Sequence, residues 1–342
     1  MRWTLAIIVA GLALASGLLL LSGCGGSEGE ESLQLVVYCG REESLVHEQL
    51  VEFEKETGID VQVLYGKGTS ELANQLLLER DLSPCDLFVA QDGGHLGLLA
   101  ERGLLSELPE SILSTVDPRF RDPDRRWIGT SGRARVLVHD PARTPAERLP
   151  RRLEDLAAPG FDLRLGWAPA NGSFQAHVSA MLAKWGEERT RTWLAAVAAK
   201  KPLRFPSNSA QVKAVASGEL DVGWVNHYYV HKLRTQDPDL AAANWSFPEA
   251  GDLGNLLMVS GVGVTAPEGP RRDAARKLAA FLVSERAQRF FAERLFEYPT
   301  RPGVATAPGV PPLEELGLAD VNPKDMIAIG RVTDLLGRLN IR

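Results

Sequence analysis

The sequence has no excess of positive charge and lacks the short motifs that mark many enzymes. Its formal net charge is −6 over 342 residues, which gives no support for binding to nucleic acid. No Gly-x-Ser-x-Gly elbow stands between a predicted strand and a predicted helix, and there is no phosphate-binding loop. No internal repeat is visible either. These absences argue against the enzyme classes that such motifs identify.

Cysteine is scarce as well, with Cys24, Cys39 and Cys85 the three residues of this type. Two cysteines in the body of an exported protein would suggest a disulfide. However, Cys39 ends one predicted parallel strand whereas Cys85 begins its neighbour, so the two lie several residues out of level. We therefore expect Cys39 and Cys85 to be free thiols.

Long hydrophobic runs are limited to the N-terminus, where residues 5–21 are apolar, and no other segment is apolar enough to cross a membrane. The run ends in Leu-Ser-Gly-Cys24, which resembles a bacterial lipobox, in which the cysteine is acylated. An uncleaved anchor and an ordinary secretory peptide are the alternatives. We expect a lipoprotein signal peptide at 1–23, lipidation of Cys24, a flexible tether at 24–32, and an exported protein anchored to a membrane face.

The remaining stretch of about 310 residues is longer than one core usually organises, which favours two lobes. Strand and helix patterns alternate in its first part, which implies a parallel sheet with ligand loops after the strands, at 38–43 and 91–94. Glu42, Glu43 and Asp92 in these loops have an alternative role, because acids also favour helix starts. The strands are expected at 33–38, 61–65 and 86–90, and the helices at 44–57, 70–80 and 95–101.

The segment 127–140 reads as a long strand that opens the second lobe. Arg133 and Arg135 alternate with apolar residues, so both arginines share one face of it. The alternative role of the pair is to protect a solvated strand edge by charge.

Two helix starts in the second lobe carry small polar residues. Asn171, Gly172 and Ser173 form a plausible seat of free backbone amides for an anion, and Asn208 stands in a similar position further on. An Asn-Gly-Ser sequence is also simply a good cap and turn.

The most distinctive stretch lies at 221–231. A short apolar strand turns polar at Asn226, a residue type that caps helices, and Tyr228 and Tyr229 follow on the first helical turn. Neighbouring side chains on a helix diverge, so one object touches both only if it is small and sits at the mouth of the turn, as a metal ion would. Alternatively, both are ordinary half-buried tyrosines.

These segments together resemble the ferric-iron-binding proteins of bacterial ABC importers. The resemblance spans nearly the whole mature chain and implies an α/β, two-lobed periplasmic-binding-protein fold of type II, with mostly parallel sheets flanked by helices and joined by hinge strands. Lobe one is expected at 33–131 and 258–303, and lobe two at 132–257 and 304–342. The matching motifs are Val37-Tyr38-Cys39-Gly40-Arg41, Ser83-Pro84-Cys85-Asp86-Leu87-Phe88, Ser131-Gly132-Arg133-Ala134-Arg135-Val136, Asn208-Ser209, Asn226-His227-Tyr228-Tyr229 and Glu297-Tyr298-Pro299.

The resemblance also implies a binding site. Tyr228 and Tyr229 are expected to bind Fe³⁺ as phenolates, which suits a hard trivalent cation able to lower a phenol pKa from near 10. A synergistic anion, carbonate or phosphate, is expected with Arg133 as its charge partner. Its seat is expected at Asn171, Gly172, Ser173, Asn208 and Asn226.

In the first lobe the sequence departs from many relatives. Glu42 stands where they carry histidine, and Gln91 where they carry glutamate. Glu42 is therefore the expected carboxylate ligand, with Glu43, Asp92 and Tyr38 as alternatives. Possible first-lobe contacts are Tyr38, Gln91 and Asp92.

The expected function is capture of Fe³⁺ by closing lobes and delivery to an ABC permease, by a monomer that is not an enzyme. One alternative is the same fold binding an organic or oxyanion ligand, phosphonate-like or thiamine-like, without metal. A zinc enzyme using His227 and His231 at helical spacing is another, although the glutamate of His-Glu-x-x-His is absent. A purely structural lipoprotein is the third.

Overall fold

The computed structural model describes residues 33–322, 326 and 329–341. The predicted signal peptide, Cys24 and the tether at 24–32 therefore lie outside the described residues. Within the described ranges, no helix is both long enough and apolar enough to cross a bilayer.

The first part of the chain forms the alternating unit that the sequence predicts. Strands β1 (Gln34–Cys39), β2 (Asp60–Tyr65) and β3 (Leu87–Ala90) are parallel, with β1 in the middle. Helix α1 (His47–Thr57) buries Leu50 and Phe53, and it ends at Gly58, whose φ of 69° is easy for a residue without a side chain. Helices α2 (Thr69–Glu79) and α3 (Gly93–Glu101) complete this part.

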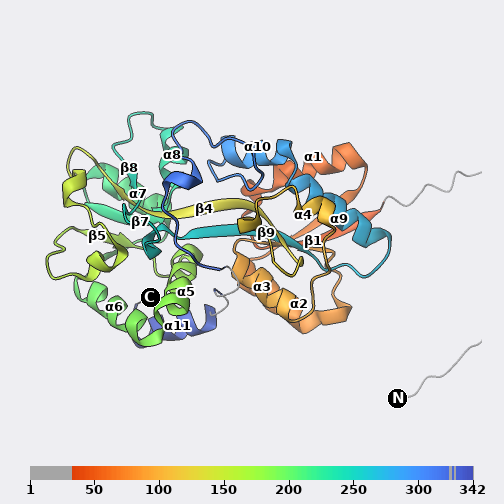
Figure 1. Cartoon of the computed structure of the whole chain (residues 1–342), viewed down its shortest axis with the longest axis horizontal. Helices are drawn as coiled ribbons and strands as arrows, with labels where there is room; N and C mark the ends of the chain where they lie inside the picture. Colours follow the sequence, from red (N-terminus) through yellow and green to blue (C-terminus); the bar gives the residue numbers. More distant parts are fainter. Residues whose placement is uncertain (1–32, 323–325, 327–328, 342) are drawn as a thin grey trace, which may run out of the picture. The chain divides into compact units, whose positions relative to one another are not determined.

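Two long strands connect the two parts of the sheet. Strand β4 (Ile128–His139) is buried along its whole length, and it pairs antiparallel with β9 (Leu257–Val264), β7 (Val222–Asn226) and β8 (Ala243–Trp245). The strand order is β2-β1-β3-β9-β4-β7-β5-β6, so the sheet is mixed where β4 and β9 cross the molecule (Figure 1). Because β4 is central, the alternative that Arg133 and Arg135 protect a sheet edge is wrong.

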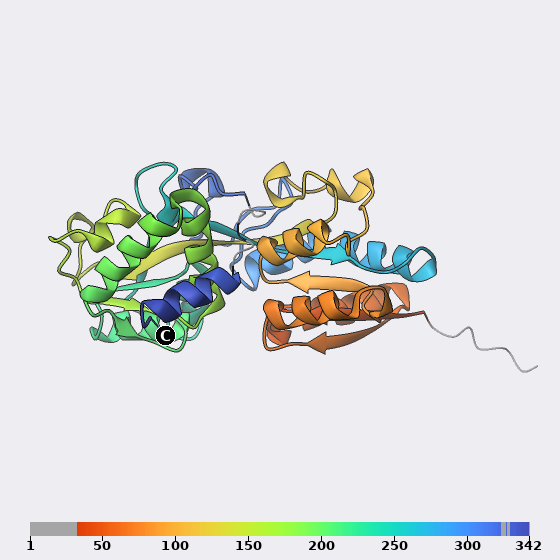
Figure 2. The ribbon, with the colours of Figure 1, turned by 90° about the horizontal axis from the view of Figure 1, so that it is seen from below.

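The second part has a parallel set of its own, in which β5 (Leu165–Trp167) lies between β6 (Leu203–Arg204) and β7. Helix α11 (Ile329–Arg338) lies beside α5 (Gly172–Trp185), as Figure 2 shows. The other helices are α4 (Glu110–Leu113), α6 (Glu187–Ala199), α7 (Asn208–Ser217), α8 (Tyr228–Arg234), α9 (Pro270–Leu282) and α10 (Glu285–Glu293). Short 3-10 helices lie at Glu43–Leu45, Arg80–Leu82, Pro118–Phe120, Ala146–Arg148, Leu153–Ala157, Leu253–Asn255 and Leu313–Glu315.

The hydrophobic residues gather into separate cores along this sheet. The first core contains Leu35, Phe53 and Phe88, and the second is built around Trp224 and Phe174. A smaller cluster of valines lies between β4, β7 and α7. Late in the chain, Ala307, Val310, Leu313 and Leu316 pack into the first core, beyond the residue 303 at which the sequence ends lobe one. The exact lobe boundaries stay a prediction.

The expectation of two free thiols is confirmed. Cys39 is level with Val89 in the β1–β3 ladder, whereas Cys85 precedes Leu87, the partner of Val37. Both thiols are buried, and burial raises the pKa of Cys39 to about 11 and that of Cys85 to about 12. Neither is therefore a reactive thiolate near neutral pH.

Candidate functional site

The two tyrosines lie side by side where β7 passes into α8. Their rings are stacked, with centroids 4.3 Å apart and an interplanar angle of 29°. Tyr228 is 5% exposed and Tyr229 is half-buried at the rim of the valine cluster. The fold thus brings two phenol rings together at the end of a strand.

Asn226 does not cap α8, which corrects the sequence-based expectation. It remains in β7, level with Arg135 of β4, and His227 occupies the cap position without a side-chain cap bond. The side-chain Nδ2 of Asn226 instead donates to the hydroxyl of Ser173 (3.0 Å), and its side-chain Oδ1 accepts from the guanidinium of Arg135 (2.9 Å). Pairing in the β4–β7 ladder extends the strand by one residue and frees this side chain to connect two elements.

The phenol of Tyr228 lies in an environment that favours its neutral form when no cation is bound. Burial raises the pKa of Tyr228 well above 10, and negative charge on Tyr229 and Glu297 acts in the same direction. The charge of Arg133 opposes this shift. A phenolate at Tyr228 therefore requires a strong nearby positive charge.

Arg135 supplies one buried cation beside the tyrosines. It is 1% exposed, and its donors go to neutral oxygens of Asn226 (2.9 Å), Trp224 (2.9 Å) and Asn208 (3.4 Å). Among the described residues it forms no ion pair with a carboxylate within 4.0 Å. Burial lowers the pKa of Arg135 to about 9, whereas negative charge on Tyr229 and Tyr228 would raise it. The sequence had suggested only that Arg135 shares a strand face with Arg133.

The predicted anion seat assembles into one connected group of polar side chains. Asn171 caps α5 by accepting from the amide of Ser173 (3.0 Å), and it also accepts from the amide of Asn208 (3.4 Å). Asn226 and Arg135 join the same group through Ser173 and Asn208. The cap uses most of the first-turn amides of α5, because Ser173 donates to the side chain of Asn171 and Phe174 and Gln175 donate to its backbone carbonyl. The backbone amide of Gly172 is the first-turn donor that remains for an anion.

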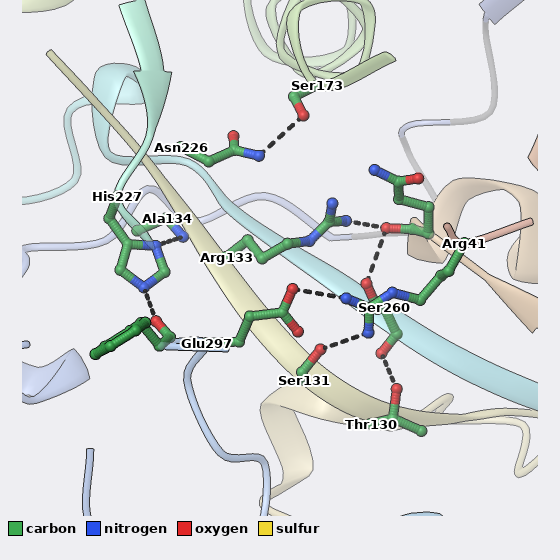
Figure 3. A network of polar contacts seen from close by, with 12 residues as sticks. Arg41, Thr130, Ser131, Arg133, Ala134, Ser173, Asn226, His227, Ser260 and Glu297 are labelled. Carbon is green, nitrogen blue, oxygen red and sulfur yellow. Dashed lines mark hydrogen bonds and ion pairs between the residues drawn. The ribbon is translucent and has the colours of Figure 1, made fainter. Parts of the chain in front are cut away.

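A cavity of about 450 Å³ lies beside this seat. From the start of α5, it is lined by Asn171, Gly172 and Ser173. From the loops after β1 and β3, it is lined by Glu42, Gln91 and Asp92. Arg133 of β4 also lines it and donates to the backbone carbonyl of Gln91 (Figure 3). Tyr228 and Tyr229 are not among the lining residues, so Arg133 is the group shared by the cavity and the tyrosines.

The candidate first-lobe ligands are placed differently from one another. Glu42 lines the cavity and is exposed, which leaves its carboxylate accessible. The side chain of Glu43 is 63% exposed and lies 3.9 Å from His47. Tyr38 is turned away from the cavity, since its hydroxyl donates to Glu79 (2.9 Å) and accepts from Gln75 (3.2 Å). The expectation of a contact from Tyr38 is therefore corrected: it packs on the α2 side of β1.

Asp92 has partners within its own helix. It caps α3 by accepting from the amide of His95 (3.0 Å), and its carboxylate accepts from the ring Nδ1 of the same residue (2.8 Å). Although burial opposes ionisation, the charge and hydrogen bonds of His95 and the charge of Arg133 hold the pKa of Asp92 below its usual value. The pKa of His95 is raised by Asp92 against the effect of burial.

The two histidines considered for zinc do not form such a site. In His227, Nδ1 accepts from the amide of Ala134 (3.1 Å) and Nε2 donates to the carbonyl of Phe296 (2.7 Å), as Figure 3 shows for Ala134. Burial lowers the pKa of His227 to about 3, so the ring stays neutral and both nitrogens are in use. The described residues contain no group of three or more histidine, cysteine or acidic side chains suited to a metal ion.

A buried ion pair lies close to the site, and the sequence analysis assigned it no role. Arg41 donates to Glu297 (2.6 Å), and both side chains are 1% exposed. Arg41 also donates to the hydroxyl of Ser131 in β4 (3.3 Å), as Figure 3 shows. Both residues occur in motifs quoted for the family resemblance, but their pairing across 256 residues leaves no local pattern in the sequence.

Comparison with known proteins places this geometry in context. Residues 83–317 match the family described as bacterial extracellular solute-binding protein. The chain is 31% identical to the Fe(3+)-binding periplasmic protein of Serratia marcescens, covering 94% of this chain and 96% of that one. It is 33% identical to iron uptake protein A1 of a Synechocystis strain, covering 83% and 82% respectively. Its structure superimposes on iron-bound HitA from Pseudomonas aeruginosa with a TM-score of 0.82 at 30% identity, covering 90% of this chain and 99% of HitA.

Proposed function

The chain belongs to the bacterial extracellular solute-binding proteins, among their ferric-iron-binding members, and from this premise we propose that Tyr228 and Tyr229 capture Fe³⁺ as phenolates. The ion is cargo and not a resident cofactor. The two-lobed periplasmic-binding-protein fold expected from the sequence is confirmed by the likeness to solved ferric-binding proteins. Members of this family bind and transport solutes, and their export agrees with the expected secretion of this chain.

The buried charge of Arg135 is the observation that carries the proposal. An isolated charge inside a protein is costly unless a counter-charge compensates it. The hydrogen-bond partners of Arg135 are neutral oxygens. The negative charges that would stabilise its charged form are those of Tyr229 and Tyr228 when these are ionised. A trivalent cation that displaces both phenol protons creates these phenolates and satisfies its own preference for anionic oxygen ligands. The exchange still adds one net positive charge, so the buried charge of Arg135 is balanced only when an anion binds together with the cation.

The anion belongs to the same proposal. Two phenolates leave a trivalent ion with residual positive charge, and Arg133 and Arg135 add more. Carbonate or phosphate on the backbone amide of Gly172 and the amide side chains of Asn208 and Asn226 would balance this charge. The hydrogen bonds that already connect these residues hold the seat in place before the anion arrives.

The first lobe is proposed to contribute through Glu42. Glu42 lines the cavity together with Asn171 and Gly172 of the second lobe, and closure about β4 and β9 would bring its carboxylate onto the metal. Gln91 contributes a backbone carbonyl that already accepts from Arg133 and from Ser260 (3.2 Å). We propose that Asp92 supports this wall through its contacts with His95, and that Glu42 and not Asp92 is the metal ligand.

Delivery follows from the family. We propose that the loaded protein acts as a monomer, held at the membrane face by a lipid on Cys24, and passes its iron to an ABC permease. The acylated cysteine and the tether keep the body of the protein within reach of that permease.

A second candidate is an organic or oxyanion ligand without metal. It is favoured by one observation: the cavity has its own donors in Arg133 and the backbone amide of Gly172, whereas the tyrosines are not on its wall. Colour separates the two candidates, because a ferric phenolate absorbs visible light and a metal-free complex does not.

The test is the paired substitution Tyr228→Phe and Tyr229→Phe, examined with ferric citrate. We expect the visible absorption to disappear and ferric affinity to fall by more than about 100-fold, because both charged ligands are lost. Tyr298→Phe is the control: Tyr298 is buried, as Tyr228 is, and its hydroxyl has no partner in the described part of the chain. Full affinity in the double variant would overturn the assignment.

A further inference from the structure

The first-lobe wall of the cavity carries three side chains in an arrangement that iron binding does not require. The ring Nε2 of His95 lies 2.9 Å from the hydroxyl of Ser70, and its Nδ1 lies 2.8 Å and 2.9 Å from the two carboxylate oxygens of Asp92. All three residues line the cavity. Ser70 is half-buried and His95 is 7% exposed, so the pair lies at the wall and not on the outer surface.

The partners of His95 determine where its ring proton lies. An ionised carboxylate only accepts hydrogen bonds, so the proton of the neutral ring lies on Nδ1, which donates to Asp92. In the neutral ring the lone pair is then on Nε2, which accepts from the hydroxyl of Ser70. This is the sequence of roles found in a nucleophile, a general base and a group that orients the base.

Two helices hold this arrangement. Asp92 is fixed because it also caps α3 through the amide of His95. Ser70 is fixed because its neighbour Thr69 accepts from the amide of Gln91 (2.9 Å) and donates to the carbonyl of Gly40 (3.3 Å). The start of α2 is thereby attached to the ends of β1 and β3, next to α3.

The start of α2 also offers hydrogen-bond donors beside Ser70. The first-turn amides of a helix have no partner within the helix. Gly68 at the cap position forms no side-chain cap bond, and Gly68, Thr69, Ser70 and Glu71 all line the cavity. Backbone amides at this position suit a developing oxyanion, including the amide of the nucleophile itself.

We propose that Ser70, His95 and Asp92 form a catalytic triad that hydrolyses small carboxylic esters in this cavity. The hydroxyl oxygen of Ser70 attacks the ester carbonyl carbon while its proton passes to Nε2 of His95, and the carbonyl oxygen becomes an oxyanion facing the α2 amides. The ester C–O bond then breaks, and the alcohol leaves with the proton from His95. Water gives a proton to His95 and attacks the acyl group on Ser70, which releases the carboxylic acid and returns the proton to Ser70. Asp92 stays ionised throughout and holds the ring.

This activity does not use Tyr228 or Tyr229, although it shares its cavity with Glu42 and the proposed anion seat. It also explains why no linear enzyme motif is present: Ser70 comes from α2, whereas His95 and Asp92 come from α3, 25 residues further along in the case of His95. The alternative role for His95 is that of a metal ligand, because many metal-binding histidines donate their other ring N–H to a carboxylate, as His95 does to Asp92.

The test uses the purified chain with p-nitrophenyl acetate and a fluorophosphonate probe. We expect hydrolysis with an initial burst, and a probe adduct on the tryptic peptide of residues 68–80, which contains Ser70. Ser70→Ala should remove the adduct and lower the rate by about 100-fold or more, and His95→Gln should do the same. Ser217→Ala is the control, since its hydroxyl donates to a backbone carbonyl within α7 and has no histidine beside it in the described structure.

Folding of each variant is checked by its thermal unfolding midpoint, which Ser70→Ala should leave unchanged because the hydroxyl is half-buried and its loss opens little space. A wild-type chain that takes no probe on residues 68–80 would overturn the proposal. So would a Ser70→Ala variant that hydrolyses the ester at the wild-type rate. Loss of ferric binding in His95→Gln with no esterase activity in the wild type would instead identify His95 as a metal ligand, and would equally overturn it.

Discussion

At the scale of single residues, the proposed iron site depends on the protonation of Tyr228. Burial raises the pKa of Tyr228, so binding of the cation must release a proton that the empty site retains at neutral pH. Arg135 nearby is charged but has neutral partners. On our proposal, the charges of the tyrosines and the arginine are balanced only when a hard cation and its anion bind together.

The pH dependence of iron binding follows from this balance. Because the pKa of Tyr228 is raised in the metal-free protein, protons compete with Fe³⁺, and ferric affinity should fall as pH falls. The decrease should be roughly tenfold per pH unit for each proton released. Competition with citrate between pH 8 and pH 6 measures the affinity, and a pH-stat measures the protons released on binding. An affinity that does not change with pH would contradict the phenolate assignment.

At the scale of elements, the segment at residues 297–298 connects the end of β1 to β4. Tyr298 pairs with Gly132 of β4, and the preceding Glu297 forms the buried ion pair with Arg41, which follows β1. The ring of Tyr298 also stacks on His227, with centroids 4.5 Å apart. Three elements that are distant in sequence thus meet beside His227, the residue that precedes Tyr228.

Glu297→Gln tests this connection. The amide keeps the shape but removes the charge, and the guanidinium of Arg41 is left buried without compensation. We expect the free energy of unfolding to fall by about 3–5 kcal/mol, measured by urea denaturation. The double variant Arg41→Met, Glu297→Leu should recover much of the loss, because it removes both charges. A single variant as stable as the wild type would show that the pair contributes little to the connection.

At the scale of the whole molecule, our proposal assigns capture and retention of the ion to different parts. The tyrosines and the proposed anion seat lie on β7, α8 and α5, whereas Glu42, Gln91 and Asp92 lie after β1 and β3. β4 and β9 join the two parts, and Arg133 on β4 already contacts the loop after β3. Closure about these strands would add the first-lobe ligand to an ion that the second lobe has captured.

Glu42→Gln separates the two steps. The visible ferric phenolate absorption should remain, because both tyrosines are intact, while ferric affinity falls by about tenfold or more with the loss of a charged ligand. Glu43→Gln is the matched control: it is the next residue, its side chain is 63% exposed and it should have no effect. Equal affinities for wild type and Glu42→Gln, measured by citrate competition, would assign the first-lobe contact elsewhere.

Much of this molecule could be predicted from local pattern. The alternating strands and helices of the first part, the long β4 and the unpaired cysteines follow from periodicity and strand level, which depend on neighbouring residues. The helix start at Asn171 is also local, since a cap residue acts within its own first turn. Side-by-side tyrosines at a strand end were visible as a candidate site for the same reason.

Tertiary structure alone decided the charges and contacts around that site. Whether Arg135 is solvated or buried depends on which strands flank β4, and whether Tyr38 faces the cavity depends on which face α2 covers. Asn226 lost its expected cap role because the β4–β7 ladder extends through it. Ser70, His95 and Asp92 meet because two helices pack side by side. Sequence pattern reports the preference of a residue for its own element, whereas these outcomes depend on partners tens to hundreds of residues away.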